Sequence, residues 1–598
     1  MASCWAFSAS APLESAILRY TGISMSLSEN NIQNIGLEYS KYGVNGMMET
    51  GIQTVGGAYA LAWFGVFSSE YDAYDQLGKV SPIIAPASAI HFQDMVIIPA
   101  RKNATDNNPI KEAVLKYGAV GVGYAVGRGP YINGSSQYCY DDLLLDHGVT
   151  IVGWDDNYPK EMFYKTPPGD GAWIIKNSWG EAAGDHGYYY ISYYDVNFST
   201  KSTATAFPLN NTVQYDKNYQ TDVMGIIDYS NNSNTYMNIY EALDNDAIAA
   251  VGTYFNESGI DYTVEIYVND VLKHTQTGIS PFSGFHTIQL DTTIPIKKGD
   301  AFAAKIISNS VPKSTLSRLH YLENTSKYLV NGNWVDASIE NATCVLKVYT
   351  VELPIYTEDL VKIYKNASQF EANIGVANET VTFEINGGTY NRISDENGTA
   401  RMTINLNPGN YSIKTTYNNF SVENSIVVLP TLIAENLVKY YRNASQFFIS
   451  LIDEAGNPVA GKNITMNING VFYNRLTNEN GTAKLNINLN PGDYILTATD
   501  PLTGLMMSYN ITVLPTLNAT DLEMKYKDGS KFMVSVLDGQ GKPLAKAKVT
   551  FNINGVLYTR TSDSEGIAKL NINLMAGEYI ITSEYDGLRI SNTITIKD

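Results

Sequence analysis

Three residues of this sequence have the side chains and local settings that nucleophilic catalysis needs. Cys4 is expected in the first turn of a helix, where free backbone N–H groups and the helix dipole favour the thiolate. His147 stands directly before an apolar strand and can exchange protons with that thiol. Asn177, at the end of another apolar strand, can accept the imidazole N–H and orient the ring. Together they predict a thiolate that attacks a carbonyl carbon.

Each of these residues also has an ordinary structural interpretation, so the prediction depends on their combination. A cysteine at a helix start is usually inert, and a histidine before a strand is usually structural. No metal or organic cofactor is expected. His91 and His186 have no second ligand at metal spacing. The glycines of residues 121–127 lie in a strand pattern and open no helix, unlike those of a dinucleotide loop.

The segments around the three residues resemble the signature segments of papain-family cysteine peptidases, in the same order and spacing. They are Ser-Cys-Trp-Ala-Phe-Ser at 3–8, Asp-His-Gly-Val-Thr-Ile-Val-Gly-Trp at 146–154 and Asn-Ser-Trp-Gly at 177–180. The resemblance covers roughly residues 1–195. It implies that Cys4 is the nucleophile, that His147 is the general acid and base, and that Asn177 orients the histidine. Trp179 would cover the His–Asn hydrogen bond from water.

The resemblance also implies where substrate binds. Residues 43–46, Gly-Val-Asn-Gly, are similar to the glycine-rich loop of the family's substrate cleft. We therefore expect Asn45, Gly46 and Met47 to contact substrate, together with Asp146 beside the histidine. Met47 stands where the family usually has a second glycine, and its side chain would restrict how closely the substrate backbone approaches.

The elements expected around these residues make residues 1–200 an α+β domain. Residues 3–20 read as a helix with Ser3 at the N-cap and Gly22 just beyond the C-terminus. Residues 109–117 read as a second, short helix, and strands dominate from residue 119 onward. This domain resembles the papain-like catalytic fold.

Residues 205–352 have almost no helical periodicity and predict an all-β sandwich of jelly-roll type. Expected strands include residues 247–254, 262–268 and 302–307, whose apolar and polar positions suit half-buried strands. This region resembles the lectin-like domain that follows papain-type catalytic domains in some archaeal and bacterial surface proteins. A cell-surface glycan or cell-wall polymer is therefore an expected partner.

The remaining residues contain an internal repeat. Versions of one segment, Phe-Asn-Ile-Asn-Gly-Val-Leu-Tyr at 551–558, recur at 383–390 and 466–473. The turn glycines Gly398, Gly481 and Gly566 follow at intervals of 83 and 85 residues. Short alternating strands bounded by Gly, Asn and Pro predict tandem immunoglobulin-like sandwiches. The expected repeats are residues 355–430, 431–515 and 516–598, and they resemble those of archaeal adhesin-like proteins.

Composition restricts where this multidomain chain acts and what it binds. Its 598 residues are 44% hydrophobic and only 17% charged, which supports packed domains throughout. A net charge of −19 with no Lys/Arg cluster argues against nucleic acid as a partner. No apolar stretch is long enough to predict a membrane span. Eighteen Asn-x-Ser/Thr sites favour an extracellular or cell-surface location, although an Asn- and Thr-rich chain also produces them by chance.

The sequence therefore predicts an extracellular cysteine endopeptidase that hydrolyses proteins or peptides and carries β-rich adhesive or spacer domains. The alternative is an adhesin-like surface-binding protein whose papain-like domain is inactive or truncated. Hydrolysis of cell-wall peptides rather than proteins stays open. The intact set of Cys4, His147 and Asn177 favours an enzyme over a decayed domain.

The start of the chain carries one further expectation. In the papain family, a glutamine six residues before the nucleophile donates to the oxyanion, and that position would precede Met1 here. A signal sequence is not seen either. We expect the peptidase domain to be N-terminally truncated and the chain as written to be weakly active, since losing one oxyanion donor costs about 10²–10³ in kcat. An upstream-extended chain is expected to be competent.

Overall fold

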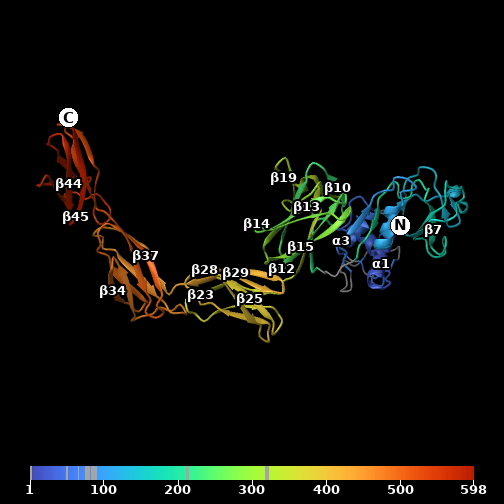
Figure 1. Cartoon of the computed structure of the whole chain (residues 1–598), viewed down its shortest axis with the longest axis horizontal. Helices are drawn as coiled ribbons and strands as arrows, with labels where there is room; N and C mark the ends of the chain where they lie inside the picture. The colour runs from blue at the N-terminus through green and yellow to red at the C-terminus, as the bar shows by residue number, and fades with distance from the viewer. Residues whose placement is uncertain are drawn as a thin grey trace. The chain divides into compact units, whose positions relative to one another are not determined.

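The computed structural model describes residues 3–38, 40–48, 51–64, 66, 68–74, 81, 90–209, 215–316 and 322–598. The chain divides into two compact units, Met1–Pro354 and Ile355–Asp598 (Figure 1). In the described residues, no helix is both long enough and apolar enough to cross a membrane.

The first part of the Met1–Pro354 unit is α+β, as predicted. Its α-helices in the described residues are α1 (Cys4–Thr21), α2 (Glu29–Gly36), α3 (Gln53–Leu61) and α4 (Asn108–Tyr117). Helix α1 ends at Gly22, whose φ of +74° is the left-handed conformation that suits glycine after a helix. Helix α2 is capped at its N-terminus by Ser28, whose hydroxyl accepts the N–H of Asn31. The sequence patterns predict α1 and α4 but neither α2 nor α3.

The strands of this part are consecutive neighbours in a twelve-stranded sheet and extend from one edge of it. They are β1 (Met95–Ile98), β2 (Val120–Tyr124), β3 (Ile132–Asn133), β4 (Ser136–Gln137), β5 (His147–Asp155), β6 (Ala172–Lys176), β7 (Tyr188–Ser192) and β8 (Ala204–Ala206). Their order is β3-β4-β7-β6-β5-β2-β8-β1. Helix α1 packs against β5, with Trp5, Leu13 and Ile17 buried.

The second part of the unit is all-β, as the sequence predicted. Its strands are β9 (Lys217–Tyr219), β10 (Ile226–Ser230), β11 (Thr235–Glu241), β12 (Asp246–Phe255), β13 (Asp261–Val268), β14 (Val271–Ile279), β15 (Gly284–Ile296), β16 (Ala301–Ile307), β17 (Val311–Thr315), β18 (Ser326–Val330), β19 (Asn333–Asp336), β20 (Ala342–Cys344) and β21 (Leu346–Glu352). A six-stranded sheet has the order β14-β13-β16-β11-β18-β19, and a three-stranded sheet the order β10-β17-β20. Strands β15, β12, β21 and β9 complete the twelve-stranded sheet.

The two parts are joined by main-chain pairing between β1 and β15. Met95 lies opposite Phe285 and Val96 opposite Gly284 in an antiparallel ladder. A Cβ at Gly284 would lie 2.0 Å from the Met95 carbonyl oxygen, so only glycine permits this approach. Phe285 is fully buried in the same apolar cluster as residues from α1, α2 and α3. The predicted α+β and all-β regions therefore share both a sheet and a core.

The all-β part also holds the C-terminal end of α3. The side-chain amides of Asn218 and Gln220 donate to the carbonyl oxygens of Leu61 and Ala62, at 3.2 and 2.9 Å. The last carbonyls of a helix have no partner within the helix, so these amides satisfy groups that would otherwise be unpaired. Helix α3 is thereby fixed by residues far away in the sequence.

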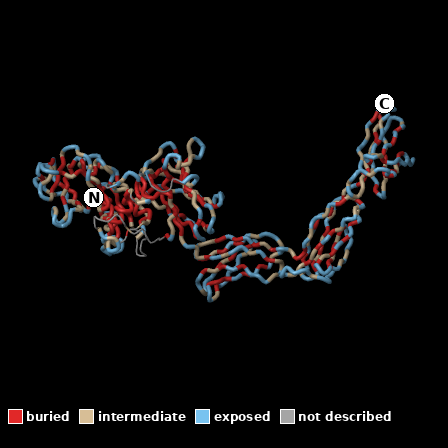
Figure 2. The backbone as a smooth tube through the Cα atoms, turned by 180° about the vertical axis from the view of Figure 1, so that it is seen from behind, coloured by how far each residue is buried: buried red, intermediate tan, exposed pale blue. Residues whose placement is uncertain are grey.

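The Ile355–Asp598 unit contains the same pair of sheets three times, one of three strands and one of five. The first pair comprises β22 (Tyr356–Thr357), β24 (Gln369–Asn373) and β27 (Thr399–Thr403), with β23 (Leu360–Ile363), β29 (Phe420–Leu429), β28 (Gly409–Tyr417), β25 (Thr380–Ile385) and β26 (Gly388–Ile393). The second comprises β30 (Leu432–Ile433), β32 (Gln446–Leu451) and β35 (Thr482–Asn486), with β31 (Leu437–Tyr440), β37 (Met506–Leu514), β36 (Gly492–Thr499), β33 (Asn463–Ile468) and β34 (Val471–Leu476). The third comprises β38 (Leu517–Ala519), β40 (Lys531–Val536) and β43 (Ile567–Asn571), with β39 (Leu522–Lys525), β45 (Leu588–Lys597), β44 (Gly577–Tyr585), β41 (Lys548–Ile553) and β42 (Val556–Thr561). Figure 2 shows buried and exposed positions alternating along these strands, as two-layered β-structures require.

Consecutive repeats are joined by the same hydrogen bond at both junctions. The Asn366 side-chain amide donates to the Glu454 carbonyl oxygen at 2.7 Å. The Asn443 amide donates to the Gly539 carbonyl oxygen at 2.5 Å. Both asparagines begin the sequence Asn-Ala-Ser, and the third repeat has Asp528 at the corresponding position.

Candidate active site

The fold brings Cys4, His147 and Asn177 together from three separate elements. Cys4 is the first residue of α1, His147 is the first residue of β5, and Asn177 directly follows β6. Strands β5 and β6 pair side by side, which places Asn177 near the beginning of β5. His147 Nε2 lies 2.8 Å from Asn177 Oδ1. His147 also interacts with the Cys4 thiol, whose pKa it lowers. The three predicted residues therefore form one cluster.

Helix α1 reaches His147 because the next residue on β5 is a glycine. A Cβ at Gly148 would lie 3.1 Å from the Ser8 Cβ and 3.3 Å from the Cys4 carbonyl oxygen. The Ser8 hydroxyl donates to the Val149 carbonyl oxygen at 3.0 Å and anchors the helix on the strand. The separation between the thiol and the imidazole is therefore set by buried packing.

Trp179 lies over the imidazole ring of His147. Its ring stacks on the imidazole with the centroids 5.1 Å apart and the planes 18° from parallel. Asn177 Oδ1 also accepts the backbone N–H of Ser178 at 2.8 Å, which fixes the orientation of the amide. A ring over this pair limits the access of water and strengthens the hydrogen bond.

The surroundings of Cys4 and His147 favour the charged pair of thiolate and imidazolium. Burial raises the pKa of Cys4, but hydrogen bonds from His147 and the Gly148 N–H, with the imidazolium charge, outweigh burial and leave that pKa below its ordinary value. Burial lowers the pKa of His147, but hydrogen bonds to Cys4 and Asn177, with the thiolate charge, leave it above its ordinary value. The pair therefore exists as ions over a pH window that is wider than either residue alone would give.

These two shifts predict a bell-shaped pH profile of kcat/KM for a peptide substrate. Activity should rise as the pH passes the lowered pKa of Cys4 and fall as it passes the raised pKa of His147, because hydrolysis needs both the thiolate and the imidazolium. Asn177→Ala removes one interaction that raises the His147 pKa, so the alkaline limb should move to lower pH. Rates measured across pH check this, and an unmoved alkaline limb would contradict it.

A hollow of about 570 Å³ opens beside Cys4 and His147. Asp146, predicted to contact substrate, lines it, and its carboxylate accepts the Val126 N–H at 2.8 Å. The other lining residues come from α1, from the beginning of α3 and the residues before it, from β2, and from β5 and β8 and the residues before each: Trp5, Gly51, Ile52, Gln53, Thr54, Gly123, Leu145, Gly148, Ser202, Thr203 and Thr205. The lining is more apolar than polar. Its glycines have no side chains that would fill the hollow, so a side chain of the substrate could enter it.

Asn45, Gly46 and Met47, also predicted to contact substrate, do not line this hollow. The Asn45 N–H donates to the Leu316 carbonyl oxygen at 2.7 Å, and the Gly46 N–H donates to the Glu38 carboxylate at 2.7 Å. Met47 packs against the apolar core shared by the two parts of the unit. The prediction of a restricted cleft at Met47 therefore does not apply to the hollow beside Cys4.

Gly51, which the sequence patterns did not single out, lines the hollow next to the nucleophile. A Cβ there would lie 2.4 Å from the Trp5 indole, so a larger residue would displace either the tryptophan or the cleft wall. The available signal was a glycine two residues before α3. It was missed because α3 itself was not predicted.

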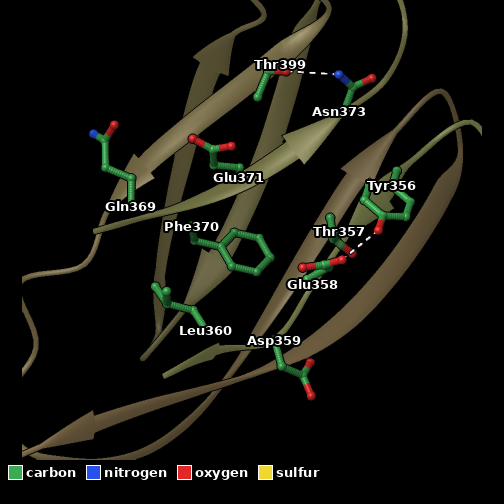
Figure 3. A pocket seen from close by; sticks show the side chains of 10 residues that line it. All are labelled: Tyr356, Thr357, Glu358, Asp359, Leu360, Gln369, Phe370, Glu371, Asn373 and Thr399. Carbon is green, nitrogen blue, oxygen red and sulfur yellow. Dashed lines mark hydrogen bonds between the residues drawn. The ribbon is translucent and has the colours of Figure 1, made fainter. Parts of the chain in front are cut away.

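Two further kinds of candidate site are possible in the described residues, a metal-ligand cluster and a second hollow. In the part of the chain that the structure describes, no three His, Cys, Asp or Glu side chains are grouped to hold a metal ion. A hollow of about 420 Å³ lies in the first repeat, and Figure 3 shows the side chains that line it. Its Glu358 accepts the Tyr356 hydroxyl at 2.6 Å, and its Glu371 accepts Arg401 Nε at 2.8 Å. These carboxylates are already paired, and the lining contains neither His nor Cys.

Two protein families match the chain. Residues 2–207 match the family described as papain family cysteine protease. Residues 218–350 match the family described as lectin like domain.

The peptidase match extends to individual relatives. Human cathepsin L2 is 30% identical over 213 residues, covering 34% of this chain and 59% of that protein. Procathepsin L of Rattus norvegicus is 32% identical over 216 residues, covering 35% of this chain and 59% of that protein. The chain thus spans less than two thirds of the length of these relatives.

A solved structure shares the arrangement of the first unit. It comprises the cysteine protease and lectin-like domains of Cwp84, a surface layer associated protein of Clostridium difficile. The TM-score is 0.51 at 23% identity, covering 58% of this chain and 84% of that one. A second structure, a variant of the clostridial cysteine protease Cwp84 after propeptide cleavage, also gives a TM-score of 0.51 at 23% identity, covering 59% of this chain and 94% of that one. At 23% identity these structures show that the fold is similar, and nothing beyond the fold.

Proposed function

We propose that this protein is a cell-surface cysteine endopeptidase, because residues 2–207 match the papain family of cysteine proteases and residues 218–350 match the lectin-like domain. Hydrolysis of peptide bonds would use Cys4, His147 and Asn177. The observation that carries the proposal is the grouping of these three side chains beside an open hollow, with His147 Nε2 2.8 Å from Asn177 Oδ1 and the Cys4 pKa lowered by His147.

The geometry supports a two-step hydrolysis. The Cys4 thiolate attacks the peptide carbonyl carbon, and the imidazolium of His147 gives its proton to the leaving amine nitrogen. The resulting thioester is attacked by water, whose proton passes to the now neutral His147, and the acid is released as the thiolate reforms. Asn177 keeps the ring aimed at both sulfur and substrate, and Trp179 keeps water from its hydrogen bond.

The cell-surface location and the glycan partner belong to the same proposal. The Cwp84 structures come from a surface layer associated protein, and the lectin-like domain is the part of this chain suited to a glycan or cell-wall polymer. We propose the domain boundaries 1–200, 205–352, 355–430, 431–515 and 516–598, with the last three as immunoglobulin-like spacers. Protein and peptide substrates are favoured over an adhesion-only role because Cys4, His147 and Asn177 are all present and lie together.

Selective labelling by a thiol-directed epoxide tests the proposal on the full chain. The three cysteines provide an internal comparison, since only Cys4 is half-exposed and has a lowered pKa. Burial raises the pKa of Cys139 well above its ordinary range and that of Cys344 to about 12, so neither should react. We expect one equivalent of label per chain, located on Cys4 by peptide mass mapping.

The matched control is His147→Ala, which keeps all three thiols but removes the group that stabilises the thiolate. Labelling at Cys4 should become slow in this variant. An unreactive Cys4 in the folded protein, or equal labelling of Cys139, would overturn the proposed function.

A further inference from the structure

The lectin-like domain carries an open hollow of about 330 Å³ whose lining is dominated by asparagines. Asn231, Asn232 and Asn234 come from the loop between β10 and β11, and Asn309 from the loop between β16 and β17. Asn331 comes from the turn between β18 and β19. We refer to these residues, with Leu329 on β18, as the asparagine hollow. No charged residue lines it.

Three of the five amide groups in the asparagine hollow are free to bind a ligand. The side chains of Asn231, Asn232 and Asn331 bond no other described residue. Asn234 uses only its oxygen, which accepts a threonine hydroxyl at 2.9 Å. Asn309 is already engaged, because it donates to Asn256 Oδ1 at 2.8 Å and accepts the Ser310 hydroxyl at 3.2 Å. Each free carboxamide both donates and accepts hydrogen bonds. A ligand surface with alternating donors and acceptors, such as the hydroxyl groups of a sugar, matches such a lining. Phosphate would need cations, and a metal ion would need carboxylates.

The loops of the hollow are held in place before any ligand binds. Asn331 and Gly332 have φ values of +49° and +79°, and they connect the paired residues Val330 and Asn333. This is the two-residue hairpin turn that Asn-Gly favours. The Ser308 N–H donates to the Asn234 carbonyl oxygen at 2.8 Å and ties two of the loops together. Binding would therefore cost little loop ordering.

An exposed tryptophan lies next to the hollow. Trp334 on β19 is the direct cross-strand partner of Leu329, which lines the hollow, so both side chains are on the same face of the sheet. Trp334 is 43% exposed, although tryptophan is usually buried in a single domain. A flat aromatic face beside free amides can cover the apolar face of a sugar ring while the amides bind its hydroxyl groups.

We propose that the asparagine hollow and Trp334 form the carbohydrate-binding site of the lectin-like domain, and that its ligand is a neutral saccharide. This proposal rests on the proposed cell-surface function. It adds where the glycan binds and that the glycan is uncharged. Its position on loops of the lectin-like domain separates glycan binding from the chemistry at Cys4.

Affinity electrophoresis through gels containing a polysaccharide tests this proposal. The probes are dextran, mannan and galactan as neutral polymers and polygalacturonate as an acidic one. The sample is the full chain with Cys4→Ala to prevent self-cleavage. It is produced in a host that adds no N-glycans, because Asn231 begins the sequence Asn-Asn-Ser. At least one neutral polymer should retard the protein, whereas polygalacturonate should not.

The variants that locate the site are Trp334→Ala and Asn232→Ala, both at positions in the site that are not buried and not in the Asn-Gly turn. Each should weaken retardation by about tenfold, the effect typical of a central contact. The matched control is Ile279→Ala, an apolar residue 63% exposed on β14 at the other edge of the same sheet. It should leave retardation unchanged.

Absence of retardation by every neutral polymer, retardation by polygalacturonate alone, or equal retardation of Trp334→Ala would overturn the proposal. Epoxide labelling of the chain with native Cys4 is measured in parallel. Normal labelling with no saccharide binding would refute this site while leaving the peptidase intact, so the two proposals fail separately.

Discussion

Replacing His147 with alanine is expected to lower kcat/KM for a peptide substrate by about 10⁴-fold. The change removes the proton donor for the leaving amine and the charge that holds the Cys4 pKa down. Cys4 would then act mainly as a neutral thiol at neutral pH, and its labelling rate should increase toward alkaline pH. Initial rates with a fluorogenic peptide, together with the pH dependence of labelling, measure both effects.

Asn177→Ala is the variant to compare with His147→Ala, because it removes the residue that positions the ring but keeps the ring itself. Because Asn177 acts through His147 at 2.8 Å and does not contact the thiol, we expect a smaller loss, of about 10–100-fold. A folded His147→Ala variant that keeps most of its activity would refute the assignment of His147. An Asn177→Ala loss as large as that of His147→Ala would show that orientation of the ring, rather than its charge, controls the rate.

Replacing Lys347 with alanine is expected to lower the free energy of unfolding of the Met1–Pro354 unit by about 3–5 kcal/mol. Lys347 is buried on β21, and its ammonium lies 2.9 Å from the Asp222 carboxylate. It also donates to the Gln220 side chain at 2.6 Å, and the amide of Gln220 in turn caps α3. The substitution would leave Asp222 buried without a cation and loosen the cap of a helix that borders the hollow beside Cys4.

The double variant Lys347→Met with Asp222→Leu is the matched control. Removing both charges avoids an uncompensated carboxylate, so most of the lost stability should return. Urea titration can follow the exposure of the Cys139 and Cys344 thiols in a Cys4→Ala background. These cysteines lie only in this unit, so the assay does not report on the repeats. A double variant as unstable as Lys347→Ala would show that packing, rather than charge, accounts for the loss.

The grouping of Cys4, His147 and Asn177 could be predicted because each lies in a segment that resembles a papain-family signature and is also marked by a local pattern. Cys4 starts a helix with a recognisable end at Gly22, and His147 and Asn177 lie at the ends of apolar strands. Strand alternation likewise predicted the all-β regions and the repeats. These patterns extend over a few residues, so they can be recognised without knowing what packs against them.

Features that depend on contacts between distant segments could not be predicted in this way. Helix α2 has the sequence Glu-Asn-Asn-Ile-Gln-Asn-Ile-Gly, which has little helix propensity, yet its asparagines are buried by the surrounding chain. The pairing of β1 with β15 joins segments far apart in the sequence, and neither strand indicates its partner. Gly51 is explained only by the Trp5 ring beneath it.

The hydrogen bonds between repeats have a consequence for sugar attachment. Asn366 and Asn443 each begin an Asn-Ala-Ser acceptor sequence, but their amide nitrogens already donate to the neighbouring repeat at 2.7 and 2.5 Å. An N-linked glycan attaches to that same nitrogen and would need the space that the next repeat occupies. In a cell that performs N-glycosylation, Asn366 and Asn443 would have to receive the glycan before the repeats associate. Otherwise they would stay unglycosylated. A glycan added before that association would prevent the hydrogen bond and keep adjacent repeats apart by steric hindrance.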